Sequence, residues 1–388
     1  MNAEGPRGSA ASWHSNMGFD DFVGNPNAVE LLRGMMARQR LPHALLFSGP
    51  LGIGKYTLAQ MLAKSIHCLN AAKQQAFDFC GECKACRAIA IADDRYAVTE
   101  QAEEEREAIS KRPREIPLII QNYPDVVILP PNGPLRLFQI EQARYLREAL
   151  SFLPAAGRKK IFILPEVERM DAAASNALLK SLEEPPEYAL LLLTTANESA
   201  LLPTIRSRCV TVWLSPVPRT QVLEFLATRE TDERRRELRT SLSQGSPGRA
   251  VRMNLDEYLR LRESLLAILI AGSERRDFSE LFRQSQKLSR EKERLENLLE
   301  VLYSLLQDIL HIETKATREP LRNADRPKAL LQIARSMGAG GVAAAAAALG
   351  NLERNLRRNV SMQIALEAFA AALSPRSPAD RRRMPSEL

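Results

Sequence analysis

The sequence has no apolar run of the length that a membrane span requires. Apolar stretches such as 189–195 are far shorter than the roughly 20 residues of a transmembrane helix. The first residues, MNAEGPRGSAASWHSN, also lack the apolar core of a secretory signal peptide. These absences disfavour membrane and secreted proteins, and we expect a cytoplasmic protein.

Basic residues exceed acidic ones in this sequence. The formal net charge is +7 and the pI is near 9.2, which is the sign expected of a protein with a polyanionic partner such as nucleic acid. The alternative is that the charge lies on solvated helix faces and in the C-terminal SPRSPADRRRMPSEL, whose composition cannot form a core. No basic segment interleaved with aromatic residues stands out, so the sequence assigns no DNA-contacting residues.

The chain of 388 residues is too long for one ordinary core, so we expect two or three domains. Between 19 and 216, short apolar runs alternate with helical patterns, which indicates a parallel sheet covered on both faces. The predicted strands are 44–47, 125–129, 161–164, 190–195 and 210–214. After 216 the sequence predicts helices only, including a broad leucine stripe at 295–310.

The stretch GPLGIGKYT, at 49–57, follows an apolar run and precedes an amphipathic helical pattern. In this context a GxxxxGK loop presents backbone N–H groups to phosphate, and its lysine neutralises the terminal phosphates. The alternative is a chance glycine-rich turn. We predict a nucleotide-binding site formed by Gly49, Gly52, Gly54, Lys55 and Thr57.

Hydrolysis requires magnesium as well as phosphate contacts, and the sequence lacks two of the groups that hold it. Tyr56 occupies the position of the magnesium-binding serine or threonine, and its hydroxyl lies too far from the backbone to replace that ligand. Thr57 is the next residue of the helix, so its side chain is rotated by about 100° from the required direction. The apolar run 161–164 is followed by Pro165 and Glu166, so one acid of the usual pair is missing. Glu166 is left as a residual candidate for activating water. We therefore expect that ATP is bound without efficient turnover and that a Mg²⁺ site is doubtful.

Four of the five cysteines are grouped. Cys80, Cys83 and Cys86 form a CxxCxxC run, and Cys68 lies twelve residues earlier, near the end of the helical pattern that follows the glycine loop. Four thiolates can enclose one Zn²⁺ tetrahedrally and leave no open position, which predicts a structural zinc site. Disulfides and an iron–sulfur cluster are the alternatives, although a cytoplasmic chain disfavours disulfides. Cys209 stands apart and is predicted to be a buried free thiol.

Several longer motifs carry a resemblance to a known family. They are FDDFVGNPNAVELLRGMMARQRLPHALLFSGP, CGECKAC, SNALLKSLEEPPE, TTANESALLPTIRSRC and NLERNLRRNVSMQIALEAF. With these the chain, from Phe19 to about Leu373, resembles the bacterial clamp-loader AAA+ family, which includes the γ/τ and δ′ subunits of DNA polymerase III. The combination of SNALLKSLEEPP with TIRSRC is highly specific.

The resemblance implies an α/β fold: a P-loop AAA+ parallel-sheet domain with an inserted zinc module, a helical lid and an all-α collar. The implied domains are a disordered tail at 1–18, the AAA+ domain at 19–216, the lid at 217–253, the collar or oligomerisation domain at 254–374, and a disordered tail at 375–388. Within the AAA+ domain, the zinc module covers about 66–90. A charged segment at about 93–121 looks like an insertion, and its composition predicts a solvated excursion or flexible loop without an assigned function.

The resemblance also implies a mechanism and partners. In the family, five subunits form an open ring, and the arginine of an SRC motif, here Arg208, acts on the ATP of a neighbouring subunit. The alternative for Arg208 is a structural role in capping a short helix. The implied partners are the γ/τ and δ subunits, the sliding clamp and primed DNA. The departures at Tyr56 and Pro165 favour the δ′ branch, and a second nucleotide-sensing arginine falls on Gly248, which puts that role in doubt.

Two other functions remain open from the sequence. One is a motor ATPase of the γ/τ type that uses Glu166 and an unusual magnesium site. The other is a zinc-stabilised scaffold that binds no nucleotide.

Overall fold

The structure is a computed structural model that describes residues 18–109, 116–133, 136–156, 158–274, 278–290, 295–314, 321–357 and 360–373. The chain forms two compact units, Met1–Gln221 with Ser246–Gly248, and Val222–Gly245 with Arg249–Leu388. Apart from Gly18, the two predicted tails lie outside the described residues. The division of the second unit into a lid and a collar remains a prediction.

The first unit is built on a six-stranded sheet with the order β2-β3-β4-β5-β1-β6. Its strands are β1 (Ala44–Ser48), β2 (Ile120–Tyr123), β3 (Val126–Ile128), β4 (Lys160–Leu164), β5 (Ala189–Thr195) and β6 (Val210–Trp213). Neighbouring strands are parallel except for β2 and β3, which are antiparallel. The α/β fold and all five predicted strands are confirmed.

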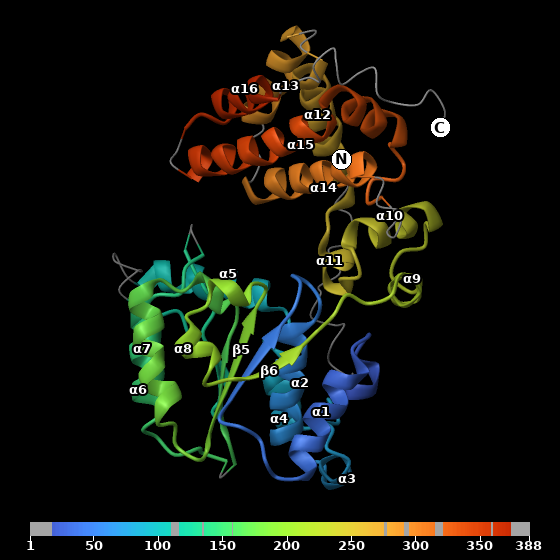
Figure 1. Ribbon diagram of the computed structural model, residues 1–388. Helices are drawn as coiled ribbons and strands as arrows, with labels where there is room; N and C mark the ends of the chain where they lie inside the picture. Colours follow the sequence, from blue (N-terminus) through green and yellow to red (C-terminus); the bar gives the residue numbers. More distant parts are fainter. Residues whose placement is uncertain are drawn as a thin grey trace. The chain divides into compact units, whose positions relative to one another are not determined.

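Helices cover both faces of the sheet, so every residue of its central strands β1, β4 and β5 is buried. Side chains of one face, such as Leu46, Phe162 and Leu191, pack in a core with α6 (Ile140–Ala149) and α7 (Ala172–Glu183). Helix α2 (Lys55–His67) packs against β1 and β5, and Figure 1 shows α2 and α4 on the side of the sheet away from α6 and α7. The residues that follow β1 and β4 therefore extend from buried, hydrogen-bonded strands.

Strand β2 is the element that the sequence did not predict. Ile120 is buried, but Gln121 and Asn122 are exposed, so the strand has no apolar run. It pairs antiparallel with β3 at the edge of the sheet. Its first two residues are the last of the charged segment at 93–121, so that segment leads directly into the sheet.

The remaining helices of the first unit surround this sheet. They are α1 (Pro26–Ala37), α3 (Ala71–Gln75), α4 (Lys84–Ala90), α5 (Arg95–Ile109) and α8 (Pro203–Arg206). Short 3-10 helices span Phe19–Asp21, Val167–Arg169 and Glu198–Ala200. Helix α5 corrects the expectation of a solvated excursion, because Arg95 and Arg106 on this helix are buried. The basic stretch at 111–114 lies outside the described residues.

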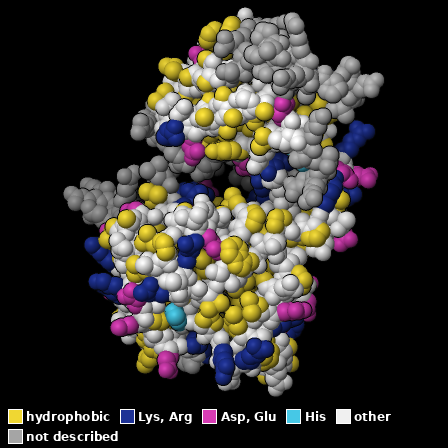
Figure 2. All heavy atoms as spheres, in the orientation of Figure 1, with side chains coloured by type: hydrophobic (Ala, Val, Ile, Leu, Met, Phe, Trp, Pro, Cys, Tyr) yellow, Lys and Arg dark blue, Asp and Glu magenta, His cyan; other side chains and the backbone are white. Residues whose placement is uncertain are grey.

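The charge of the first unit is dispersed on the face that Figure 2 draws. Among the described residues of that face, lysine and arginine side chains are mixed with acidic and apolar ones and do not form one basic patch.

The second unit contains helices only among its described residues. They are α10 (Glu233–Ser243), α12 (Leu255–Glu274), α13 (Phe278–Arg290), α14 (Leu295–Thr314), α15 (Pro327–Arg357) and α16 (Met362–Ala372), while α9 (Arg219–Ala227) and α11 (Pro247–Arg252) contain residues of both units. Leucines of α12 and α14 form the centre of its core. Arg262 is buried in this unit and pairs with Asp325 through two contacts of 2.7 and 2.6 Å.

Helix α15 is long and apolar enough to cross a membrane by length and composition alone. Half of its most apolar window is buried in the protein, where α15 packs against α14 and α16. Gly338 interrupts its helical geometry with a φ of +66°. The packing is that of a core helix.

Candidate functional site

The glycine loop connects β1 to α2, in the context that the sequence predicts. Its backbone is possible only with glycine at two positions. Gly49 has a φ of +152°, and a Cβ atom there would lie 2.2 Å from the carbonyl oxygen of Leu214. Gly54 has a φ of +103°, and its Cβ would lie 2.9 Å from the ring of Phe22. The loop is therefore tightly enclosed by its neighbours on either side.

Lys55 lies at the start of α2 with its ammonium group turned back onto the loop. Its Nζ donates to the carbonyl oxygens of Gly49 and Pro50 at 2.6 and 2.7 Å. Burial lowers the pKa of Lys55 from 10.5 to about 8, against the opposing effect of Glu168 and Glu166. The lysine is thus a partly desolvated cation held against the backbone of the loop, which suits it to an anionic ligand.

The hydroxyl of Tyr56 makes two hydrogen bonds within the protein. It donates to the carbonyl oxygen of Ala92 at 2.6 Å and accepts from Nε2 of Gln60 at 2.7 Å. The side chain therefore points to the segment before α5, and it does not supply a magnesium ligand at the loop. Thr57, the next residue, is half-buried in the first turn of α2.

Glu166 follows β4 and Pro165, and it is surrounded by three arginines. Arg95 donates from Nη2 to Oε1 of Glu166, Nη2 of Arg136 lies 3.5 Å from the same oxygen, and Nε of Arg169 lies 2.6 Å from Oε2. Burial alone would raise the pKa of Glu166, but these guanidinium groups hold it below its usual value. We call Arg95, Arg136 and Arg169 the arginine cluster. Glu166 is thus ionised, but its oxygens face guanidinium groups.

Gly248 lies directly against the glycine loop. Its N–H donates to the carbonyl oxygen of Gly52 at 2.9 Å, and a Cβ atom on Gly248 would come within 2.8 Å of that oxygen. No larger side chain fits at this position without displacing the loop. The adjacent Arg249 pairs with Glu300 at 2.7 Å within the second unit. The position of the second nucleotide-sensing arginine is thus held by a glycine, and the neighbouring arginine is engaged by Glu300.

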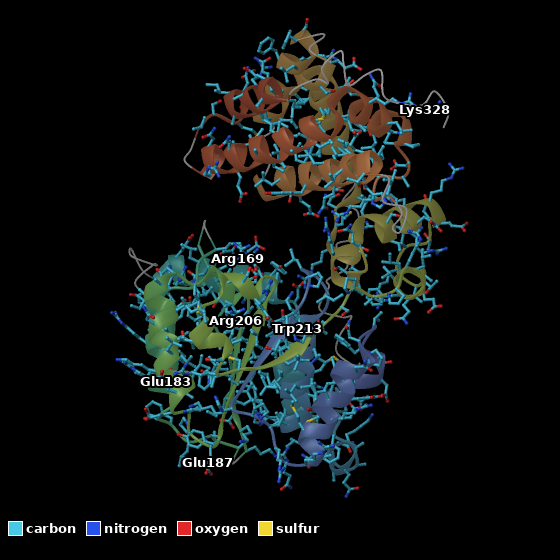
Figure 3. The ribbon with its side chains drawn as sticks, in the orientation of Figure 1. Arg169, Glu183, Glu187, Arg206, Trp213 and Lys328 are labelled. Carbon is cyan, nitrogen blue, oxygen red and sulfur yellow. The ribbon has the colours of Figure 1, made fainter. Side chains whose placement is uncertain are left out.

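Arg208 lies in a separate part of the first unit. Its Nη2 donates to Oε1 of Glu183 at 2.8 Å, and its Nη1 donates to the carbonyl oxygen of Thr204 in α8 at 2.9 Å. The second contact fits the alternative of a helix-capping arginine, while about a third of the side chain remains exposed. Figure 3, which labels Glu183 and Arg169, shows these two residues in separate parts of the first unit.

An open cavity of about 680 Å³ lies beside Arg208. Its lining residues are His43, Leu182, Glu183, Glu184, Ser207, Arg208, Cys209 and Val210. Cys209 is mostly buried here, and burial raises the pKa of its thiol to about 12. Cys209 is a free thiol, as predicted, but it is partly and not fully buried.

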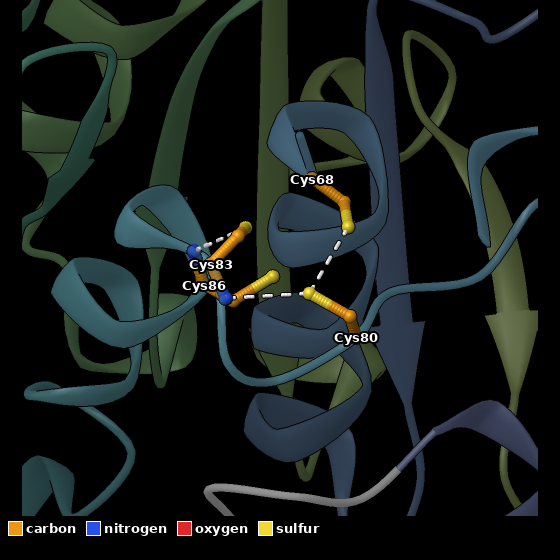
Figure 4. A group of neighbouring side chains, drawn as sticks. All are labelled: Cys68, Cys80, Cys83 and Cys86. Carbon is orange, nitrogen blue, oxygen red and sulfur yellow. Dashed lines mark hydrogen bonds between the residues drawn. The ribbon is translucent and has the colours of Figure 1, made fainter. Parts of the chain in front are cut away.

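The four grouped cysteines come together, as Figure 4 shows. The sulfur atoms of Cys68, Cys80, Cys83 and Cys86 all lie within 4.8 Å of one another, and those of Cys68 and Cys80 are 3.7 Å apart. Four sulfurs bound at about 2.3 Å to one tetrahedral ion would be separated by about 3.8 Å. All four are free thiols, which removes the disulfide alternative. The group could hold a metal ion such as zinc.

Backbone N–H groups support the cysteine cluster. Cys83 and Cys86 donate from their backbone nitrogens to the sulfurs of Cys80 and Cys83, at 3.3 and 3.5 Å. Arg158 donates to the carbonyl oxygens of Ile66 and Cys68 at 2.7 and 3.0 Å, which fixes the end of α2. Such N–H donors to sulfur stabilise thiolates, the form that binds metal.

The arginine cluster is the part of the site that sequence reasoning missed. Arg95, Arg136 and Arg169 come from α5, from the loop before α6 and from the 3-10 helix after β4. Arginine is common on solvated surfaces, and nothing in the local pattern distinguishes these three. The sequence does contain one related signal: Tyr56 replaces the magnesium-binding hydroxyl in the same chain that carries the insertion at about 93–121, which includes Arg95.

Comparison with known proteins places these features in a family. The profile described as DNA polymerase III, delta subunit, matches residues 24–218, and that described as DNA polymerase III, delta subunit, C terminal, matches residues 256–373. The first match alone covers half of the chain, including the glycine loop, the cysteine cluster and Arg208.

Individual relatives agree. The chain is 34% identical to DNA polymerase III subunit delta' of Pseudomonas aeruginosa, over 56% of this chain and 57% of the relative. It is 32% identical to DNA polymerase III subunit tau/gamma of Haemophilus influenzae, over 55% of this chain and 26% of the relative. The chain thus spans between a quarter and just over half of these relatives. A solved gamma-subunit-related protein of Thermotoga maritima matches with 22% identity, a TM-score of 0.36, and coverage of 74% of this chain and 97% of that one.

Proposed function

The chain belongs to the DNA polymerase III delta-subunit family, and from this premise we propose that it is a δ′-type subunit of the clamp loader. In this role it completes the ATP site of a neighbouring subunit and hydrolyses little or no ATP itself. It assembles with the γ/τ and δ subunits in a hetero-pentamer in the cytoplasm. That assembly helps to place the sliding clamp on primed DNA.

The observation that carries this proposal is the state of the site around Glu166. Glu166, the first acid after β4, is surrounded by arginines, and the hydroxyl of Tyr56 donates to the carbonyl oxygen of Ala92. Magnesium-assisted hydrolysis needs an oxygen ligand from the loop and an available acid. Neither is available in this arrangement, which supports a subunit that does not turn over ATP.

Nucleotide binding is a separate property from hydrolysis. We assign phosphate binding to Gly49, Gly52, Gly54, Lys55 and Thr57, because the loop retains its glycine-dependent backbone and a buried lysine. This assignment implies binding without turnover.

We assign one structural Zn²⁺ to Cys68, Cys80, Cys83 and Cys86. Four thiolates complete a tetrahedral shell, so the ion would crosslink the end of α2 to the segment before α4 without taking part in a reaction. Iron bound by the same thiolates is the alternative that metal analysis excludes or supports.

The role of Arg208 is tested in a reconstituted clamp loader. Arg208→Ala removes the guanidinium group from the SRC sequence, and DNA-stimulated ATPase of the complex is expected to fall by roughly 10³-fold or more, as for other arginine fingers. Arg206→Ala is the matched control, because Arg206 is an exposed arginine at the end of α8, two residues before Arg208. Assembly, measured by gel filtration, should survive in both variants. Normal ATPase with Arg208→Ala would overturn the assignment.

Turnover by the isolated chain separates the remaining functions. The proposal expects binding of a fluorescent ATP analogue without significant phosphate release. Turnover that Lys55→Ala abolishes would instead identify a motor ATPase of the γ/τ type. Absence of binding by a folded, zinc-loaded chain would identify a scaffold.

A further inference from the structure

The residues that lead into α5 are fixed by contacts with α2, the helix that follows the glycine loop. The carbonyl oxygen of Ala92 accepts from Tyr56 and, at 3.3 Å, from Nε2 of Gln60. One residue further on, Asp93 forms a buried ion pair with Lys64 at 2.5 Å. These contacts fix the position of the chain two residues before Arg95, the first residue of α5.

The guanidinium group of Arg95 occupies an aromatic and acidic environment. It lies 5.6 Å from the ring centroid of Tyr56 and 4.5 Å from that of Tyr96, and it donates to Glu166. Arg136 covers the ring of Tyr96 at 5.1 Å. Tyr56 therefore provides an aromatic contact for a cation that comes from α5.

The charges of this region leave an excess of positive charge. The basic side chains are Lys55, Arg95, Arg136 and Arg169, and the acidic ones are Glu166 and Glu168. The formal balance is four minus two, or +2, before any ligand binds. Burial gives these charges more effect than exposed ones would have, and Arg95 and Glu166 are both at least nine-tenths buried.

A magnesium ion does not fit such a region. Mg²⁺ binds through one or two carboxylates together with substrate phosphates. Here the carboxylate of Glu166 is already paired with three guanidinium groups, and Oε1 of Glu168 accepts from the backbone N–H of Ala196 at 3.0 Å. A divalent cation would also add to the positive excess. A phosphate chain without metal would reduce that excess.

We propose that Arg95 takes over the electrostatic role of magnesium, so that the glycine loop binds a nucleoside triphosphate or diphosphate as the free anion. This inference rests on the nucleotide binding proposed above. Arg95 acts through its charge and its pairing with Glu166, as a specificity-determining residue. The inserted helix and Tyr56 then form one device, which replaces a metal-dependent site by a metal-independent one.

The test measures binding of a fluorescent ATP analogue to the full chain, in buffer freed of divalent ions by a chelating resin, and again with added MgCl₂. A soluble chelator is avoided because it would compete for the cysteine site. The wild-type chain should bind at least as tightly without Mg²⁺ as with it. Arg95→Gln should weaken metal-free binding by on the order of tenfold, as expected for the loss of one nearby charge.

Arg95→Lys is the matched variant, because it keeps the charge and should retain most of the metal-free affinity. Circular dichroism and thermal unfolding show whether each variant is folded. Binding that requires Mg²⁺, or metal-free binding that Arg95→Gln leaves unchanged, would overturn this inference and leave the proposed nucleotide site intact. Absence of binding under both conditions would overturn the nucleotide site as well.

Discussion

The hydroxyl of Tyr56 donates a hydrogen bond to the carbonyl oxygen of Ala92 over 2.6 Å, and this contact joins α2 to the residues that lead into α5. The position at which a phosphate-binding loop usually carries a magnesium ligand is thus used to hold an inserted segment. The same segment brings Arg95 to Glu166. Loss of the metal ligand and gain of the arginine are therefore structurally connected.

Tyr56→Phe should destabilise the protein without disrupting the aromatic contact with Arg95. The substitution leaves the carbonyl of Ala92 and the amide of Gln60 without this partner, so we expect the free energy of unfolding to fall by about 1–2 kcal/mol. Urea denaturation measures the change. An unchanged free energy of unfolding would show that the hydroxyl contributes nothing to holding α5.

Tyr56→Ser tests whether the hydroxyl alone limits turnover. It restores the usual residue type but removes the ring beneath Arg95, while Pro165 and the pairing of Glu166 remain. We therefore expect no gain of magnesium-dependent ATPase, measured as phosphate release, and a larger loss of stability than with Tyr56→Phe. Substantial turnover in this variant would mean that Glu166 is available as an acid, contrary to its arginine contacts.

The sheet could be predicted from the sequence because its central strands are nearly continuous apolar runs, as in β5, which is buried along its whole length. Strand β2 could not, since Gln121 and Asn122 give it no such pattern. The glycine loop and the cysteine cluster are local in sequence, so spacing alone indicated them. The contact of Arg95 with Glu166 joins residues 71 positions apart, and only the tertiary structure brings them together.

Gly248→Ala should disturb the glycine loop. The new Cβ atom would lie 2.8 Å from the carbonyl oxygen of Gly52, and relief of that contact requires a backbone shift. We expect a loss of roughly 1–3 kcal/mol in the free energy of unfolding, the usual range for overpacking, together with weaker binding of the ATP analogue. Gly34→Ala is the control, because nothing lies within 4 Å of the added atom in α1 and the helix should gain stability. Equal behaviour of the two variants would contradict the close approach of Gly248 to the loop.

Removal of the metal should destabilise the first unit. We expect about one zinc per chain by elemental analysis, and Cys83→Ser should lose the metal and lower the melting temperature, because three thiolates no longer close the shell. Cys209→Ser is the control, since Cys209 lies apart from the other four cysteines and should leave the zinc content unchanged. Iron with visible absorbance, or full zinc content in Cys83→Ser, would contradict the assignment.

The affinity for nucleotide should fall as the pH rises through 8. Burial lowers the pKa of Lys55 from 10.5 to about 8, so the free protein carries the ammonium group below this pH and loses it above. The phosphates are ionised across this range, and binding to them favours the protonated lysine, so affinity should decrease by up to about tenfold per pH unit above 8. Fluorescence titrations of the ATP analogue between pH 7 and 9.5 measure this profile. Lys55→Arg keeps its charge throughout and should give a flat profile, whereas Arg95→Gln removes a charge that lowers the pKa of Lys55 and should move the decline to higher pH. A flat profile for the wild-type chain would show that the lysine does not carry the charge on which binding depends.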